Sequence, residues 1–238
     1  FWLKPASQES VREQKSSSSK MPRADGFVDG YGFLYQKKRS NKYFEVTCLS
    51  KWQDAEGKMP AAAADGMKEA LPKYGDDAGL RLYSMNEFYG PMNLALRNDS
   101  ATSLEDYSGL INAVRKAVLG HIEFGIVWRG VNLGSEEAAI YVPGFKFLWP
   151  AFTSASRARD CASKFGSWGS GQKVLFRIDL SGEGCTWARD ISHISAFPEE
   201  EEVVIYCYSG FEVLKRTSDG DTLIIELRTV DTLLFEVP

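Results

Sequence analysis

The sequence predicts an α+β fold, with helices in its first half and strands in its second half. Two observations predict this order. Apolar residues recur at helical spacing up to about residue 121, whereas short apolar runs bounded by glycine follow that point. Because the two patterns do not alternate, an alternating α/β fold is not expected. The 238 residues, 44% of them hydrophobic, suffice for one large domain with or without an appended segment.

Three segments of the first half have helical patterns. Pro60 suits the first turn of a helix that residues 61–71 would continue. A second pattern covers residues 80–97, and Gly90-Pro91 should break or kink that helix near its middle. The third pattern follows residue 103 and places five apolar side chains on one face, namely Tyr107, Leu110, Ile111, Val114 and Val118.

The second half contains short strand-like runs and one short helical pattern. We expect strands at residues 126–131, 145–153, 174–180, 203–208, 211–214 and 223–227. Residues 156–165 have the pattern of a short helix. This half therefore predicts the sheet of the α+β fold.

The first 60 residues differ from the rest of the chain. A serine run at residues 16–19 leaves little to bury, so residues 1 to about 25 should be poorly ordered. Two strand-like runs, 31–35 and 43–49, are separated by a polar stretch, which predicts a β-hairpin. We therefore divide the chain into an N-terminal extension, residues 1–60, which is partly flexible, and a main domain, residues 61–238.

Composition and charge exclude several classes of partner. The net charge of -4 lacks the basic excess of nucleic-acid-binding proteins, and no apolar run has the length of a membrane span. The four cysteines lie far apart, so no zinc site is expected, and either two disulfides or buried thiols would suit them. We expect a monomer without a metal. The chain begins with Phe, so its compartment stays open, and a secreted or cell-surface location is favoured over a cytoplasmic one.

The first candidate cluster is the run Val127-Trp128-Arg129-Gly130. An arginine inside an apolar strand is unusual, because a buried charge without a partner is costly. A guanidinium can grip a phosphate with two hydrogen bonds, and a glycine beside it lets a ligand approach the backbone closely. The alternative is that Arg129 belongs to a structural ion pair.

The second candidate cluster is the run Phe-Thr-Ser-Ala-Ser at residues 152–156. If this run is extended, Ser154 and Ser156 point to one face. The alternative is that one of these serines caps the helix that follows. No histidine lies nearby in the sequence to make Ser154 a nucleophile.

The third candidate cluster is the run of four glutamates at residues 199–202. Such a run is normally a solvated surface, but this one leads directly into an apolar strand. Because alternate residues of a strand share a face, Glu200 and Glu202 should point into one cleft and Glu201 away from it. Paired carboxylates are what the chemistry of glycosidic bonds requires.

Together these clusters resemble the Arg-Ser-Glu family of ADP-ribosyltransferases, which includes vertebrate ecto-enzymes and bacterial binary toxins. That family has an aromatic-Arg-Gly motif, then a Ser-Thr-Ser-like motif, then Glu-x-Glu before an apolar strand. The matching positions here are residues 128–130, 154–156 and 200–202, in the same order. One departure is Ala155, where the family most often has threonine.

The resemblance extends more weakly from about residue 80 to the C-terminus. Tyr89 and Asn93 resemble a helix motif of the family, although Gly90-Pro91 interrupts it. The resemblance implies two strongly twisted, roughly perpendicular sheets around an NAD cleft, beside a helical N-terminal half. Residues 61–238 would then be the catalytic domain. They would transfer ADP-ribose from NAD, as co-substrate, to arginine side chains of a target protein and release nicotinamide.

The resemblance also implies roles for individual residues around the dinucleotide. Glu202 would stabilise the positive charge that develops on the ribose, and Ser154 would position both Glu202 and that ribose. Arg129 would bind the diphosphate of NAD. The backbone of Gly130 would face the nicotinamide amide, and Asn93 would contribute to NAD binding.

Three further residues would complete the site. Nicotinamide should stack on an aromatic side chain that follows the serine motif, either Phe165 or Trp168. Glu200 lies two residues before Glu202, as in family members that modify arginine, and would bind the guanidinium and help to remove its proton. Phe197 lies where the family often has an aromatic residue for substrate recognition.

Three alternatives stay open at this point. The same residues would serve an NAD glycohydrolase, in which water accepts the ADP-ribose. A non-catalytic module could bind NAD or a protein with this fold, and three short motifs could also match by chance. The sequence does not separate a toxin-like protein from a cell-surface enzyme or an intracellular regulator.

Overall fold

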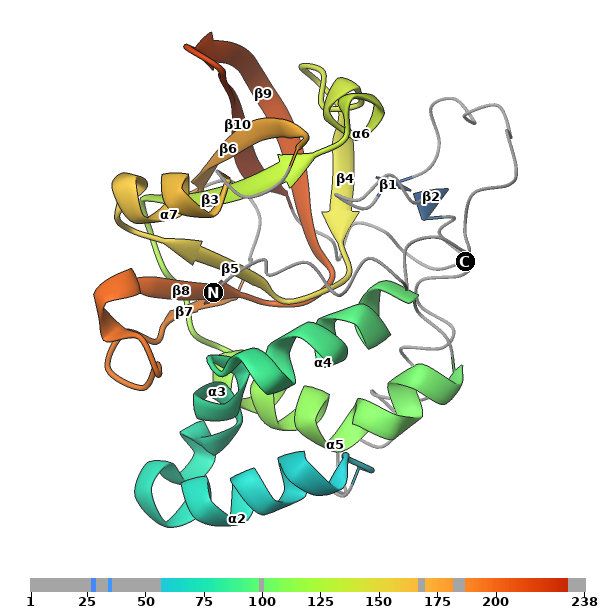
Figure 1. Ribbon diagram of the computed structural model, residues 1–238, viewed down its shortest axis with the longest axis vertical. Helices are drawn as coiled ribbons and strands as arrows, with labels where there is room; N and C mark the ends of the chain where they lie inside the picture. Colours follow the sequence, from blue (N-terminus) through green and yellow to red (C-terminus); the bar gives the residue numbers. More distant parts are fainter. Residues whose placement is uncertain are drawn as a thin grey trace.

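The helices of the first half lie together on one side of the molecule and the strands on the other (Figure 1). The computed structural model describes residues 27–28, 34–35, 57–98, 101–166, 170–181 and 187–230. The first helices are α2 (Ala61–Tyr74), the 3₁₀ turn η3 (Gly75–Asp77), α3 (Ala78–Tyr83), α4 (Asn86–Asn98) and α5 (Ala101–Val118). The prediction of a helical first half is confirmed.

Two very short strands precede these helices. β1 (Phe27–Val28) and β2 (Leu34–Tyr35) pair antiparallel. The hairpin predicted between residues 31–35 and 43–49 lies mostly outside the described residues. The division of the chain at residue 60 stays a prediction.

One predicted interruption was wrong, because α4 continues through Gly90-Pro91. Buried side chains on both sides of this pair hold the helix in place, and the proline removes only its own N–H donor. The chain breaks earlier, at Ser84 and Met85 between α3 and α4. The Ser84 hydroxyl donates to the Arg81 carbonyl at 2.8 Å and accepts the N–H of Ala196, also at 2.8 Å. The break therefore ties the helices to the loop that leads into the glutamate run.

Eight strands form one mixed sheet in the order β4-β9-β10-β6-β3-β5-β8-β7. Neighbouring strands are antiparallel except for β10 and β6, which are parallel. The strands are β3 (Ile126–Leu133), β4 (Lys146–Trp149), β5 (Thr153–Ser156), β6 (Gln172–Asp179), β7 (Ala188–Asp190), β8 (Glu202–Ile205), β9 (Ser209–Asp219) and β10 (Thr222–Val230). Three short helical segments lie between strands, namely α6 (Ser135–Ala139), α7 (Arg159–Phe165) and the 3₁₀ turn η4 (Pro198–Glu200).

The sheet narrows between β3 and β5, where only Trp128 and Ser156 are matched. This joint divides it into a five-strand part, β4-β9-β10-β6-β3, and a three-strand part, β5-β8-β7. Figure 1 shows β4 and β9 lying upright in the view, in opposite directions, and β5 and β8 lying across it. The two parts correspond to the two sheets that we expected. The run predicted as one strand, residues 145–153, is split between them, because Pro150 cannot donate to a strand ladder.

Two apolar cores lie on opposite faces of the three-strand part. Phe152 and Val204 belong to the core that packs against the helices. Ala155 belongs to the core inside the sheet. Because side chains alternate along a strand, Ser154 on β5 and Glu202 on β8 face the helices as Phe152 and Val204 do. The candidate polar residues therefore lie at the seam between the helices and the sheet.

Two kinds of feature are absent from the described residues. No helix in this part of the chain is long and apolar enough to cross a membrane. Nor does it contain a group of three or more His, Cys, Asp or Glu side chains that could hold a metal ion. Cys161 carries a free thiol, whereas Cys48 and Cys185 lie outside the described ranges.

Candidate active site

The seam between α3 and β5 holds a buried chain of polar groups. The hydroxyl of Tyr83, the last residue of α3, lies 2.7 Å from Ser154 Oγ and 3.4 Å from the carbonyl oxygen of Phe152. Asn93 on α4 places its Nδ2 3.5 Å from the same hydroxyl. Its other amide atom, Oδ1, is buried and has no hydrogen-bond partner among the described residues. The predicted residues Ser154 and Asn93 are thus brought together through Tyr83.

The glutamate run forms a tight turn before it enters β8. Glu200 ends the 3₁₀ turn η4, and Glu201 follows with a left-handed backbone (φ 46°). As a result Glu200 and Glu202 are only 8% and 4% exposed, whereas Glu201 is exposed. The expected burial pattern is present, but the turn produces it and not strand alternation, since β8 begins only at Glu202.

Glu202 is held by hydroxyl groups in a buried setting. Burial raises the pKa of its carboxyl to about 7, and repulsion from Glu200 adds to this rise. Hydrogen bonds from Ser154 and Ser195 act in the opposite direction. Ser195 Oγ lies 3.5 Å from Glu202 Oε2, and the same hydroxyl accepts the N–H of Phe197 at 3.0 Å. The half-buried Phe197 is therefore linked to Glu202 through one serine.

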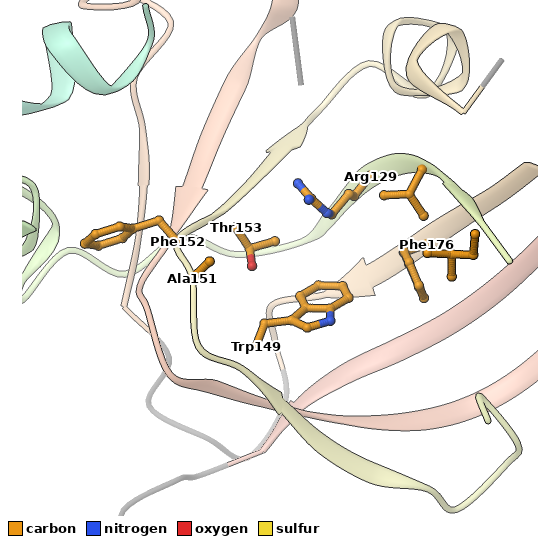
Figure 2. Close-up of a pocket in the computed structure, with 8 residues that line it drawn as sticks. Arg129, Trp149, Ala151, Phe152, Thr153 and Phe176 are labelled. Carbon is orange, nitrogen blue, oxygen red and sulfur yellow. The ribbon is translucent and has the colours of Figure 1, made fainter. Parts of the chain in front are cut away.

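Arg129 reaches the same seam from the five-strand part of the sheet. Its Nη1 donates to the backbone carbonyl of Ser154 at 2.8 Å, and its guanidinium carbon lies 5.8 Å from the centre of the Trp149 ring. Figure 2 shows the guanidinium directed toward Thr153 and away from Phe176. The arginine is half-buried on β3.

Arg129 also lines a largely apolar pocket, drawn in Figure 2. The other lining residues are Val131, Leu133, Trp149, Ala151, Phe152, Thr153 and Phe176. Neither Ser154 nor Glu202 lines it. The chemistry is therefore better assigned to the polar seam than to this pocket.

Gly130 has a structural use that differs from the expected one. A Cβ on this residue would lie 1.9 Å from the carbonyl oxygen of Ala162 and 2.9 Å from the nitrogen of Gly166. The missing side chain therefore lets α7 pack closely on β3, and does not by itself make room for a ligand. A contact between the Gly130 backbone and nicotinamide stays a prediction.

One of the two aromatic candidates for stacking, Phe165, is the last residue of α7. Phe165 is buried there, and Trp168 falls outside the described residues. Stacking of nicotinamide on either ring stays a prediction.

A comparison with known protein families shows to which family this chain belongs. A family model described as NAD:arginine ADP-ribosyltransferase matches residues 47–233. The chain belongs to the NAD:arginine ADP-ribosyltransferase family. The match includes residues 47–60, which we had assigned to the extension, and all the residues of the seam.

Individual members of this ADP-ribosyltransferase family are distantly similar in sequence. A putative NAD(+)--arginine ADP-ribosyltransferase Mav from Mycobacterium avium (strain 104) is 28% identical over 180 residues, which make up 73% of this chain and 21% of that protein. The chain thus spans about a fifth of the length of this curated relative.

Solved structures of ADP-ribosyltransferases share the fold. The Vis toxin of Vibrio splendidus, in complex with agmatine, matches with a TM-score of 0.57 and 18% identity over 74% of this chain and 86% of Vis. The ADP-ribosyltransferase HopU1 of Pseudomonas syringae pv. tomato DC3000 matches with a TM-score of 0.51 and 18% identity, over 71% of this chain and 87% of HopU1. The α+β ADP-ribosyltransferase fold that the sequence predicts is confirmed.

The two hydroxyls of the serine motif, Ser154 and Ser156, have different hydrogen-bond partners. Ser156 Oγ accepts the N–H of Ala158 at 2.9 Å and donates to the carbonyl of the same residue at 3.1 Å, just before α7 begins. These bonds form a local turn and not a helix cap, because the N-cap residue of α7 is Ala158 and has no side-chain cap hydrogen bond. The capping alternative therefore fits neither serine. Ser154 instead contacts Tyr83 and Glu202.

Sequence reasoning missed two residues that contact the predicted ones. Tyr83 lies 71 residues before Ser154, inside an apolar stretch that predicts only core packing. Ser195 lies in a polar loop without a motif of its own. A conserved position in related sequences is the signal that could have revealed them; spacing within one sequence could not.

Proposed function

We propose that this chain transfers ADP-ribose from NAD to arginine side chains of a target protein and releases nicotinamide. The observation that carries the proposal is a pair of buried carboxylates, Glu200 and Glu202, on one turn that is linked through Ser154 to Arg129. Membership of the NAD:arginine ADP-ribosyltransferase family supports the same reaction.

The residues of the seam fit NAD as the co-substrate. A half-buried guanidinium, Arg129, suits the diphosphate, because arginine binds phosphate with two parallel hydrogen bonds. The buried Oδ1 of Asn93 can accept a hydrogen bond from a bound ligand. The side chain of Phe165 or Trp168 would stack on the nicotinamide ring.

Glu202 would act on the bond between the nicotinamide nitrogen and C1′ of the ribose. When that bond breaks, its electron pair leaves with nicotinamide and positive charge spreads over the sugar ring. A fixed carboxylate beside this charge stabilises it, and Glu202 is fixed by the hydroxyls of Ser154 and Ser195. This role requires the ionised form of Glu202.

Glu200 would act on the acceptor. A carboxylate binds a guanidinium through two charge-assisted hydrogen bonds, and it can take the proton that the attacking nitrogen loses as it bonds to C1′. Its place two residues before Glu202 lets one turn hold the donor sugar and the acceptor together. Phe197, at the other end of that turn, would contact the target protein.

The test uses purified protein, NAD and agmatine, a small guanidine compound that is also present in the structure of Vis. Mass spectrometry should detect an ADP-ribosyl-agmatine adduct together with released nicotinamide. Free ADP-ribose without an adduct would favour the NAD glycohydrolase. Absence of nicotinamide release would instead favour a non-catalytic NAD- or protein-binding module. A cell lysate in place of agmatine would then identify the modified arginine and its protein.

A further inference from the structure

The hydroxyl of Tyr83 is a buried polar group for which the proposed mechanism has no use so far. The side chain is 1% exposed, and its ring packs edge-on against Phe152 and Tyr89. A phenylalanine would fill the same space, so packing alone does not explain the hydroxyl. Burying a hydroxyl is costly unless it forms hydrogen bonds, and its shortest contact is the 2.7 Å bond to Ser154 Oγ.

The neighbours of this pair fix the direction of the hydrogen bonds. Ionised Glu202 can only accept, so Ser154 must donate its single proton to reach that carboxylate. The Ser154 oxygen is then left to accept. The single proton of the Tyr83 hydroxyl has two acceptors, the Ser154 oxygen at 2.7 Å and the Phe152 carbonyl at 3.4 Å, and the shorter contact is the stronger hydrogen bond. Asn93 Nδ2 can only donate, and it lies 3.5 Å from the Tyr83 oxygen. The Tyr83 oxygen thus accepts from Asn93, which leaves its own proton for Ser154. The protons therefore point along one line, from Asn93 through Tyr83 and Ser154 to Glu202.

We propose that Tyr83 is a positioning residue that, by donating its hydroxyl proton to Ser154, keeps the Ser154 proton directed at Glu202 and so favours the ionised form that the reaction needs. This inference rests on the proposed function. Tyr83 itself does not touch the reacting atoms; it acts through Ser154. Burial and the nearby carboxylate of Glu202 raise the pKa of the Tyr83 hydroxyl, which keeps it protonated as a donor.

The ionisation of Glu202 depends on groups from several elements. Glu200 on η4 opposes it by repulsion, and the hydroxyls of Ser154 on β5 and Ser195 before η4 favour it. Tyr83 on α3 faces the same site. The positive charge of Arg129 on β3 acts to lower the pKa of the Tyr83 hydroxyl, against the larger effects that raise it. Without the Tyr83 hydroxyl, Ser154 can turn away from Glu202. The pKa of Glu202 should then rise, and the acid limb of kcat/KM, which reports the free enzyme, should move to higher pH.

The first experiment compares pH profiles of nicotinamide release for wild type, Tyr83→Phe and Tyr141→Phe. Tyr141→Phe removes a tyrosine hydroxyl that is equally buried, in the core inside the sheet. In Tyr83→Phe the acid limb should move upward by roughly half a pH unit to one pH unit, the scale of one net hydrogen bond. The rate should therefore fall by roughly 3- to 10-fold below the limb and by less than about 2-fold above it. The limb of Tyr141→Phe should stay in place.

A second variant separates positioning from a general loss of structure. If Tyr83 acts through Ser154, then Tyr83→Phe should change the profile of Ser154→Ala by less than about 2-fold at any pH, because coupled residues are not additive. A loss in Tyr83→Phe that is uniform across pH, or that adds in full to the loss in Ser154→Ala, would overturn the proposal.

A titration of Glu202 tests the same inference without any turnover. Carboxyl ¹³C signals of Glu202, assigned from their absence in Glu202→Gln, should show a higher midpoint in Tyr83→Phe than in wild type. If wild type releases no nicotinamide but this midpoint still rises, the proposed function fails and the positioning role stands. If wild type is active and the midpoint does not move, only the positioning role fails.

Discussion

Two acidic clusters lie side by side at the three-strand part of the sheet. The first is Asp190 with Glu123, the second is Glu202 with Glu200, and the pKa values of Asp190 and Glu202 are shifted in opposite directions. Asp190 ends β7 and is matched with Val203, the residue after Glu202. Burial alone would raise the pKa of Asp190, but hydrogen bonds from Ser192 and Arg157 outweigh it and hold this pKa below its ordinary value. Burial raises the pKa of Glu202 to about 7. Neighbouring carboxyls on paired strands are thus shifted in opposite directions.

The difference lies in which groups face each carboxyl. The Arg157 guanidinium contacts Asp190 at 3.4 Å and Glu123 at 2.5 Å, and it also donates to the carbonyl of Phe124 at 3.1 Å. Glu202 is more deeply buried, with hydroxyls as hydrogen-bond donors and a second carboxylate nearby. The first cluster therefore fixes the loop before β3 in place. The second holds Glu202 with a pKa of about 7, and strongly shifted pKa values are typical of functional sites.

The largest expected effect is a difference in transfer rate between a substitution in the second cluster and one in the first. Glu202→Gln should lower the rate of ADP-ribosyl transfer to agmatine by on the order of 10²-fold or more, because it removes the charge that stabilises the transition state. Asp190→Asn, in the neighbouring cluster, should change this rate by less than about 3-fold. Initial rates of adduct formation measure both. Near-normal activity in Glu202→Gln would contradict a catalytic role for the second cluster.

The second effect is on stability and follows from the raised pKa of Glu202. Between pH 4.5, its ordinary value, and about 7, the unfolded chain loses the proton first, so ionisation favours unfolding as the pH rises. Wild type should therefore lose roughly 2–3 kcal/mol relative to Glu202→Gln across this window. Urea unfolding of both proteins at pH 4.5 and pH 8 measures the change. An unchanged difference in stability would mean that Glu202 titrates near its ordinary value.

The third effect separates the two glutamates within the second cluster. Glu200→Gln should lower arginine transfer by roughly 10-fold or more, because the acceptor loses its charged partner and base. Hydrolysis of NAD should continue in this variant, because Glu202 and its hydroxyl donors are intact. Nicotinamide release with and without agmatine distinguishes the two activities. An equal loss of both would indicate that Glu200 has a structural role.

The smallest effect concerns the first cluster. Arg157→Met should lower stability by about 1 kcal/mol at pH 7 and less in high salt, because the arginine is partly exposed. The lowered pKa of Asp190 contributes stability above its ordinary value of 3.8, and this is lost as the pH falls through the lowered value. The cost of Arg157→Met should shrink accordingly at low pH. A large loss of transfer activity in this variant would show that the two clusters are not independent.

The sequence could predict features that are local. Helical and strand patterns located most elements, and the order of three motifs indicated Arg129, Ser154 and Glu202. The burial of Glu200 and Glu202 was expected for the wrong reason, because a left-handed residue between them cannot be read from a run of identical side chains.

Long-range contacts could not be predicted from one sequence. Tyr83 meets Ser154 only because α3 packs across β5, and Gly130 meets α7 rather than a ligand. The helix through Gly90-Pro91 shows the same limit, since tertiary packing overrides a local helix breaker.

The most direct measurement is a crystal structure of Glu202→Gln with NAD bound. We expect the Arg129 guanidinium to contact the diphosphate. The substituted side chain at position 202 should lie within hydrogen-bond reach of the nicotinamide ribose, with Ser154 beside it. NAD bound elsewhere, or bound with its ribose on the side of Glu123 and Asp190, would contradict this expectation.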